Sequence, residues 1–314
     1  MKNRLIKTLN IKRFKLVLLL EGLLVGILAG LVIVGYRICL TNGALWLQRI
    51  LAYCKQSIFT IIIWFVILFV IALVVTKLLD WESLISGSGI PQLEGELAGK
   101  IDAKWWRVLI AKFFGGFLAN FSGLALGREG PSIQLGAMVG KGIGKVLKRG
   151  KTEERYLLTC GASAGLAAAF HAPLAGVMFA LEEVHKHFSA PLLISVMTSS
   201  IAADYLMSSI LGMAPVFSFN IHGTLPTQYY WMVIILGIIL GLLGAFYNKA
   251  LLFVQSLYNH SKHLNNYTKL LIPFILAGIL GFTVPQLLGS GDTLVDLLIE
   301  GKLTMSLILL LLAG

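Results

Sequence analysis

The sequence predicts an all-α, polytopic membrane protein, and three observations lead to this fold class. Of the 314 residues, 57% are hydrophobic and only 13% are charged, about half the charged fraction of an ordinary soluble domain. A spanning helix needs about 20 apolar residues, and four stretches of that length contain no Asp, Glu, Lys or Arg: residues 57–76, 156–181, 205–248 and 270–291. Glycine and proline interrupt several other apolar segments, which is typical of helices that break within a membrane.

The chain opens with a basic segment. Six of the first fifteen residues are Lys or Arg and none is acidic. Positive charge before the first span marks the cytoplasmic side, so we expect a multi-pass protein of the plasma (inner) membrane with a cytoplasmic N-terminus. The following apolar stretch, residues 16–36, is long for a signal peptide and no small-residue cleavage site follows it. Since this segment carries much of the net charge of +11, no nucleic-acid partner is expected.

Apolar runs and their Gly and Pro boundaries predict the helices in order. The expected helices are 14–40, 55–78, 88–99, 105–126, 130–147, 154–169, 173–187, 190–212, 228–258, 268–284, 292–300 and 302 onward. Several of them are too short to span a bilayer. Short helices at membrane depth leave backbone groups unpaired, which is tolerated where those groups line a cavity, and broken helices of this kind are typical of transporters.

A weak internal repeat runs through the sequence. The Gly-x3-Gly pattern at 26–30 recurs at 237–241, and Gly-Ser-Gly at 87–89 recurs at 289–291. Gly-x3-Gly pairs are also common wherever membrane helices pack closely. The repeat predicts four parts: a cytoplasmic basic N-terminus (1–15), a first membrane repeat (16–212), a linker (213–227) and the start of a second membrane repeat (228–314), which we expect to be incomplete.

The segment Gly87-Ser88-Gly89-Ile90-Pro91 is the first candidate site. Pro91 is suited to the first turn of a helix, where its missing N–H costs nothing. Free N–H groups and the positive end of a helix dipole attract anions, and the Ser88 hydroxyl can donate without adding a full charge. Passage needs binding that is strong enough to admit an ion and weak enough to release it. The alternative is ordinary helix capping by Ser88.

The segment Gly127-Arg128-Glu129-Gly130-Pro131 repeats this arrangement and adds a carboxylate. An ionisable side chain between apolar helices is a functional candidate by default. Ionised Glu129 at a helix N-terminus would occupy the position that an anion prefers, and protonated Glu129 would lose that attraction and swing away. Proton and anion would then exclude one another. The alternative is an ion pair between Arg128 and Glu129 at the membrane interface.

A third motif covers residues 165–176 and leads into Glu182-Glu183. Its small residues permit close helix contacts, and adjacent glutamates point about 100° apart on a helix, so at most one should face an internal path. The spacing Glu182-x-x-His185 also occurs in di-iron proteins, but that architecture needs further Glu ligands, so no metal is expected. Lys112, within the helix at 105–126, either pairs structurally or raises the positive potential along an anion path.

These three motifs, in this order and spacing, resemble the signatures of the CLC chloride channel and transporter family. The resemblance implies a homodimer in which each subunit has its own pore, built from two inverted halves with broken, re-entrant and tilted helices. The family's second-half signature and its anion-coordinating tyrosine would lie beyond Gly314. One departure is His171, where the family typically has asparagine.

The resemblance also implies roles for individual residues. Ser88 would coordinate the central anion, Glu129 would be the external gate, and Glu183 would pass protons to the cytoplasmic side. A glutamate at the position of Glu183 is typical of proton-coupled exchangers, and a serine at Ser88 points to chloride. The expected anion-binding residues are Ser88, Gly89, Ile90, Arg128, Glu129 and Gly130.

The sequence therefore favours secondary active exchange of chloride for protons across a lipid bilayer, without a cofactor. The nearest alternative is a passive chloride channel of the same fold, gated by voltage or pH. An intramembrane enzyme is disfavoured, because no His-Glu-x-x-His motif and no positioned nucleophile accompany the two candidate carboxylates.

Overall fold

The computed structural model describes residues 2–213, 226–260, 265–289 and 291. Within these ranges every regular element is helical, which confirms the all-α fold class. Five of the described helical segments combine the length and apolar composition needed to cross a bilayer: Lys15–Cys54, Ile58–Trp81, Ala190–Leu211, Thr227–Tyr258 and Asn266–Thr283. The other helices pack among them, and several are too short to span a bilayer, as the broken pattern of the sequence predicts.

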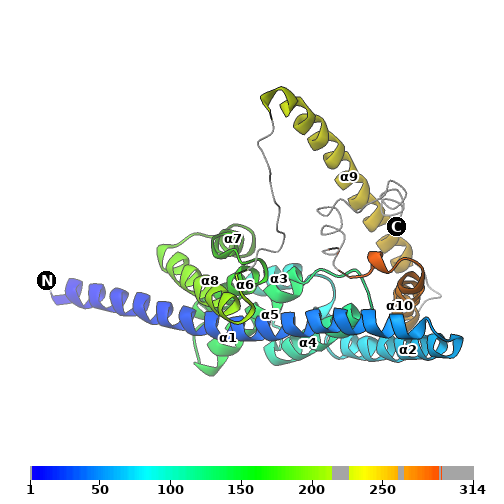
Figure 1. The fold of residues 1–314 in the computed structure, drawn as a ribbon. Coiled ribbons are helices and arrows are strands. Elements are labelled where there is room, and N and C mark those ends of the chain that lie inside the picture. The colour runs from blue at the N-terminus through cyan, green and yellow to red at the C-terminus, as the bar shows by residue number, and fades with distance from the viewer. Residues whose placement is uncertain (1, 214–225, 261–264, 290, 292–314) are drawn as a thin grey trace.

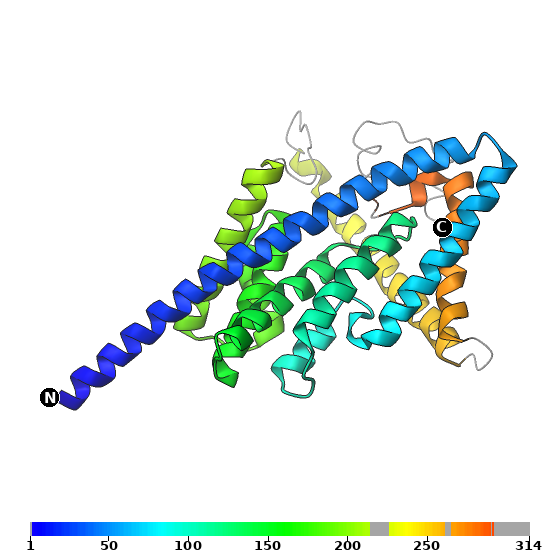
Figure 2. The same cartoon turned by 90° about the horizontal axis from the view of Figure 1, so that it is seen from below.

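Helix α1 is a single element, Lys2–Cys54, although the sequence predicted an end near residue 40. The helix continues through the Thr-Asn-Gly segment at 41–43. A β-carbon on Gly43 would lie 3.0 Å from the Phe117 ring, so this glycine admits a neighbouring aromatic side chain and does not terminate the helix. Helix α2 (Ile58–Trp81) then turns back along α1, and its Ser57 cap accepts from the Phe59 N–H (Figure 2).

Helix α8 (Ala190–Leu211) packs against α1 through a seam of small residues. β-Carbons on Gly22 and Gly30 would lie 2.7 Å from the Ser195 carbonyl oxygen and 3.0 Å from the Ala203 Cα. Gly26, between them, is in equally close contact with Ser199. The Gly-x3-Gly pattern at 26–30 is thus a helix-packing motif, as such patterns commonly are in membranes.

The first half continues with short helices that surround two buried ones. Figure 1 shows α3 to α7 gathered beside α1, and their bounds are α3 Ile90–Leu97, α4 Trp105–Phe121, α5 Glu129–Val146, α6 Lys151–Phe170 and α7 Pro173–Phe179. All residues from Ser132 to Gly144 in α5 and from Leu157 to Ala169 in α6 are buried. The core of the described structure therefore lies where α5 and α6 meet.

Two further predicted helix ends were wrong, for different reasons. Helix α4 was expected to reach residue 126, but it ends at Phe121 because Gly123 adopts a left-handed backbone with φ of 89°, which only glycine adopts without strain. The helix predicted at 173–187 divides into α7 and a π-helical segment, η2 (Ala180–His185). Lys186, with φ of 58°, ends that segment.

Helices α5 and α6 approach so closely that glycine is required at their contact. A β-carbon on Gly161 would fall far inside van der Waals contact of the Gly136 carbonyl oxygen, and one on Gly136 would meet the Gly161 carbonyl in the same way. Gly165 is equally close to the Ser132 carbonyl. Backbone-to-backbone contact of this kind lets α5 be enclosed from Ser132 to Gly144.

The second half of the described chain has two long helices, α9 (Tyr230–His260) and α10 (Asn266–Thr283). Helix α10 packs on α2, where its Phe274 is fully buried and Gly278 lies against Phe65 and Leu68. Helix α9 stands away from the others in Figure 1. The helices predicted at 292–300 and from 302 onward lie outside the described residues, as does most of the predicted linker.

The predicted repeat recurs in the backbone of the two halves. A single 3₁₀ turn, η1 (Ser83–Ile85), precedes the first Gly-Ser-Gly segment, and another, η4 (Pro285–Leu287), precedes the second. Gly87 and Gly89 have φ of 67° and 92°, and Gly289 and Gly291 have φ of 82° and 83°. Sequence and backbone thus repeat together at this point, while the four-part domain division stays a prediction.

We predict that Gly161→Ala strongly destabilises the protein, because its new methyl group would collide with the α5 backbone. Overpacking a core typically costs about 1–3 kcal/mol, and we expect the upper end of that range because the opposing atom is main chain. Thermal unfolding in detergent measures the effect. The control is Gly150→Ala, where a β-carbon meets no atom within 4 Å. Equal melting temperatures for the two variants would refute the close-contact argument.

Candidate functional site

The Ser88 loop begins helix α3. Gly89 is the N-cap, in a left-handed conformation with φ of 92°, and the Ile90 N–H donates to the Ser88 Oγ over 3.3 Å. Ser88 therefore lies just before the N-cap and takes part in capping, as the alternative interpretation held. The hydroxyl accepts in that bond, so its own proton stays available for a ligand. Capping and anion binding are compatible here.

Glu129 is the first residue of α5, and Arg128 is its N-cap. The first helical hydrogen bond runs from the Ser132 N–H to the Arg128 carbonyl, 3.0 Å. The N–H groups of Glu129 and Gly130 therefore lie in the open first turn of the helix, and Pro131 has none. The Glu129 side chain folds back over Gly127, because its Oε2 is 2.5 Å from where a β-carbon on Gly127 would be.

The two candidate loops are in direct contact. A β-carbon on Gly130 would lie 2.7 Å from the Ser88 carbonyl oxygen and 3.0 Å from the Ser88 Cα. The predicted residues Ser88, Gly89 and Ile90 of one loop and Arg128, Glu129 and Gly130 of the other thus lie at two adjoining helix N-termini. Each N-terminus carries a partial positive charge, so their juxtaposition creates a potential that favours an anion or a carboxylate.

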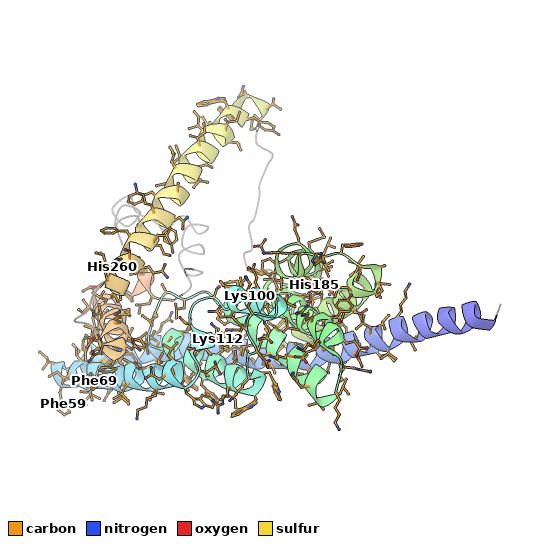
Figure 3. All side chains as sticks on the ribbon, turned by 180° about the vertical axis from the view of Figure 1, so that it is seen from behind. Phe59, Phe69, Lys100, Lys112, His185 and His260 are labelled. Atoms are coloured by element: carbon orange, nitrogen blue, oxygen red, sulfur yellow. The ribbon has the colours of Figure 1, made fainter. Side chains whose placement is uncertain are left out.

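Lys112 supports the Ser88 loop from behind. Its ammonium group donates to the carbonyl oxygens of Ile85, 2.8 Å, and Gly87, 2.7 Å, and its side chain is buried in the packed part of the molecule (Figure 3). Structural pairing, one of the two interpretations left open for this lysine, is therefore present. The ammonium group binds the carbonyl of Gly87, the residue before Ser88, so its positive charge lies close to the Ser88 loop. Structural pairing and a positive potential therefore come from the same side chain.

Lys141 is a site-supporting residue that the sequence analysis missed. It is completely buried in α5, and its ammonium group binds the Glu96 carboxylate, the Asp102 carboxylate at 2.7 Å and the Ala103 carbonyl at 2.7 Å. The hydrogen bond and charge of Lys141 hold the pKa of the Asp102 carboxyl below its usual value. This cluster fastens α3 to α5. In the sequence, Lys141 could have been recognised as a lone charge within the apolar, glycine-rich run of α5.

Glu182 and Glu183 lie on the π-helical segment η2. Both are exposed in the described structure, while Leu181 and Val184 on either side are buried. Single π turns occur frequently at functional sites. Directly after η2, Lys186 Nζ forms an ion pair with Glu94 Oε1 of α3 at a distance of 3.3 Å, which joins this segment to α3.

A polar network at the α6–α7 break was also missed. His171 ends α6 with φ of 53°, and its Nε2 lies 3.0 Å from the Arg37 Nη1 of α1. A guanidinium only donates, so the Nε2 accepts. The Nδ1 lies 3.3 Å from the Asp204 carboxylate of α8 and 3.4 Å from the Ser208 Oγ. In the sequence, this network could have been suspected from the isolated charged residues Arg37 and Asp204 within apolar helices.

Within the described ranges, no three His, Cys, Asp or Glu side chains gather closely enough to hold a metal ion. Glu182 and His185 have the di-iron spacing, but the His185 Nδ1 is hydrogen-bonded to the Thr159 Oγ1, 2.9 Å. The groups at the site are hydroxyl, backbone N–H, guanidinium, ammonium and carboxylate groups.

The family model for voltage-gated chloride channels matches residues 69–314. The chain belongs to this family. A protein named H(+)/Cl(-) exchange transporter ClcA from Vibrio parahaemolyticus is 37% identical over 236 residues, 73% of this chain and 50% of that protein. ClcA from Citrobacter koseri is 33% identical over 310 residues, 94% of this chain and 64% of that protein. The chain thus spans about half to two-thirds of the length of these curated relatives.

Solved structures of the family support the same fold. The crystal structure of a slow cyanobacterial Cl⁻/H⁺ antiporter superimposes with a TM-score of 0.86 at 30% identity, over 94% of this chain and 70% of that one. A CLC-type fluoride/proton antiporter superimposes with a TM-score of 0.74 at 22% identity, over 95% and 73% of the two chains. The second likeness concerns the fold alone. The predicted CLC-like fold is confirmed.

We predict that Lys112→Met lowers the stability of the protein and weakens halide binding. The substitution keeps a long apolar stem but leaves the Ile85 and Gly87 carbonyls without their donor, at about 1–3 kcal/mol for each buried group left unpaired. Thermal unfolding with and without added bromide separates the two effects. Lys77→Met, at an exposed position of α2, is the control. A Lys112→Met protein that bromide stabilises as much as it stabilises wild type would contradict the supporting role.

Proposed function

We propose that the protein exchanges chloride for protons across a membrane, with its anion site at the two adjoining helix N-termini. The observation that carries this proposal is the direct contact between the Ser88 loop and the first turn of α5, which Gly130 permits. The relatives described above are named as H⁺/Cl⁻ exchangers or titled as antiporters, which supports exchange as the mode of transport.

The anion would be held by dipoles and hydroxyl groups. The Ser88 O–H and the open N–H groups of the first turn of α5 are neutral donors, and the nearest described lysine ammonium group, that of Lys112, is turned toward carbonyl oxygens. Neutral donors bind an anion less tightly than a bare ammonium group would, and a transported ion must leave as well as enter. A monovalent, weakly basic anion such as chloride fits this set of donors.

Glu129 would act as the gate because its carboxylate competes with the anion for the same helix N-terminus. When ionised, it is attracted to the partial positive charge of α5 and blocks the site. When protonated, it loses that attraction and yields the site to chloride. One proton taken up therefore permits anion movement, and the folded-back side chain over Gly127 is the starting point for such a swing.

Glu183 would carry protons between Glu129 and the cytoplasm. It lies on η2, and Lys186, directly after η2, forms an ion pair with Glu94 of α3, so the candidate proton acceptor lies beside the helix that follows Ser88. The same proposal includes the inner half of the proton route and the facing wall of the anion site. It also includes a homodimeric assembly and a plasma-membrane location with the N-terminus inside. The wall falls outside the described residues.

We predict that Glu129→Ala abolishes proton coupling, because the variant has no carboxylate to exchange a proton for an anion. Full-length protein in liposomes with an outward chloride gradient should lose uphill proton uptake while chloride efflux persists. Asp80→Ala, at an exposed position of α2, is the matched control and should stay coupled. Retained, pH-dependent proton uptake by Glu129→Ala would reject the gate assignment.

We predict that Glu183→Ala also uncouples transport but leaves chloride flux intact. The adjacent Glu182→Ala variant is a close control, since both side chains are exposed on the same segment and only one is assigned a proton role. Proton and chloride fluxes are measured together in liposomes. If wild-type protein moves chloride without any uphill proton flux, the protein is a passive channel and the exchanger proposal fails.

A further inference from the structure

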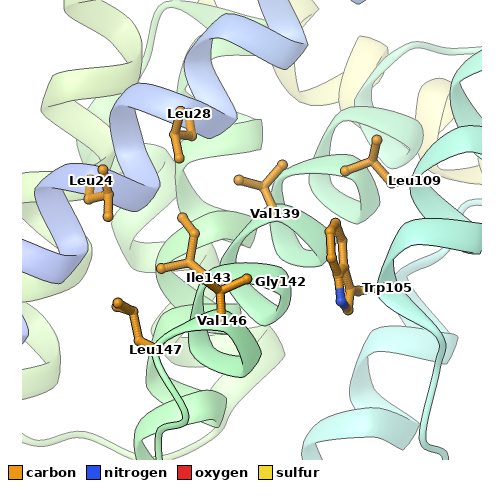
Figure 4. A pocket seen from close by; sticks show the side chains of 9 residues that line it. All are labelled: Leu24, Leu28, Trp105, Leu109, Val139, Gly142, Ile143, Val146 and Leu147. Carbon is orange, nitrogen blue, oxygen red and sulfur yellow. The ribbon is translucent and has the colours of Figure 1, made fainter.

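An apolar groove lies between α1, α4 and α5, at the opposite end of α5 from Glu129 (Figure 4). It encloses about 310 Å³, which falls at the lower limit of the roughly 300–1,000 Å³ of typical ligand sites. Leu24 and Leu28 form the α1 wall, Trp105 and Leu109 the α4 wall, and Val139 and Ile143 the floor on α5. Apart from the indole nitrogen, the side chains that line it are hydrocarbon.

The groove is open along one side. Val146, at its end, is 73% exposed, and Leu24 is 41% exposed. These aliphatic surfaces belong to a chain whose α1 is a membrane-spanning candidate, so the medium that meets the opening is the bilayer. From Val139 to Leu147 the groove extends about 12 Å along the axis of α5, which is most of one leaflet of a hydrocarbon core about 30 Å thick.

Basic side chains gather at one end of the groove. Lys104 immediately precedes Trp105, and Lys148 immediately follows Leu147, and both are exposed. The start of α4 adjoins the end of α5, because a β-carbon on Gly142 would lie 2.8 Å from the Trp105 ring. The two lysines therefore extend from neighbouring walls of the groove.

Two other cations at this end are already paired. Lys145 binds Glu154, 3.1 Å, and the Arg149 Nε donates to the Glu21 carboxylate, 2.6 Å. Glu21 lies less than one turn before Leu24 of the α1 wall. The Arg149–Glu21 ion pair therefore places the basic end of the groove beside the part of α1 that directly follows the basic N-terminal segment. This end of the groove thus lies in the leaflet on the N-terminal side of the membrane.

We propose that this groove binds one acyl chain of an anionic phospholipid whose phosphate lies between Lys104 and Lys148. The hydrocarbon lining fits an acyl chain and offers no partner for a polar ligand. The basic groups stand at one end only, which matches a molecule with one charged head and an apolar tail. Lysine side chains near the membrane surface attract anionic lipid head groups by about 1 kcal/mol each.

The proposal is tested by native mass spectrometry of the full-length protein with dioleoyl phosphatidylglycerol or dioleoyl phosphatidylcholine. Wild type should retain one phosphatidylglycerol in preference to phosphatidylcholine. Lys104→Gln/Lys148→Gln should weaken phosphatidylglycerol binding about five-fold for each lysine. The control with equal charge is Lys55→Gln/Lys249→Gln, at exposed positions just after α1 and on α9, which should bind like wild type. Equal loss in both double variants, or none in either, would overturn the proposal.

The groove itself is tested by filling it. Val146→Trp should lower the occupancy of both lipids, whereas Val70→Trp, at a 54% exposed position of α2, should not. If Val146→Trp instead changes the oligomeric state and leaves lipid binding unaltered, a second copy of the chain occupies the groove and the lipid proposal is wrong. Wild-type protein provides an independent measurement. A phosphatidylglycerol with a photoreactive group in its acyl chain should label residues 139–147, and labelling confined to other segments would refute the site.

Discussion

The backbone contact between α5 and α6 is the constraint on which the rest of the structure depends. Gly136 and Gly161 each lie where any β-carbon would strike the other helix, so the pair can approach only as glycines. Close approach encloses α5 from Ser132 to Gly144 and directs its N-terminus into the molecule. Glu129 is placed by this contact, because it is the first residue of the helix that the contact holds. The small residues of α6 are therefore as much a part of the site as the residues within it.

Two lysines fix the positions of the backbone N–H groups at the starts of α3 and α5. Lys141 fastens α3 to α5 through Glu96 and Asp102, and Lys112 shapes the loop before Ser88 through two carbonyl oxygens. Removing one partner of a buried ion pair such as Lys141–Glu96 typically costs about 3–5 kcal/mol, and leaving a buried carbonyl such as that of Ile85 unpaired costs about 1–3 kcal/mol, so neither attachment is easily released. The donors at Ser88 and Gly130 are held rigidly by groups that do not themselves donate to the ligand.

Sequence reasoning could predict the fold class, most helix locations and the two loops of the candidate site, because hydrophobic runs, Gly-Pro breaks and isolated charges are local features. It failed where tertiary contact decides the outcome. Helix α1 continues past the predicted end near residue 40 and through Gly43, which lies against Phe117. The change to a π-helix at Ala180 has no local signature that we can identify. The pairing of Lys141 with Glu96, and of His171 with Arg37, joins residues far apart in the chain. Only the presence of a lone charge, not its partner, is visible in a sequence.

The unbroken length of α1 has a consequence for how the protein sits in a membrane. Its candidate spanning segment, Lys15–Cys54, has 40 residues and is therefore roughly 60 Å long, about twice the thickness of a hydrocarbon core. A segment of that length remains within the core only if it runs strongly oblique to the membrane normal, far beyond the average tilt of about 20°. Such a helix contacts α4, α5, α6 and α8 at different depths in the membrane and so holds these helices in register with one another.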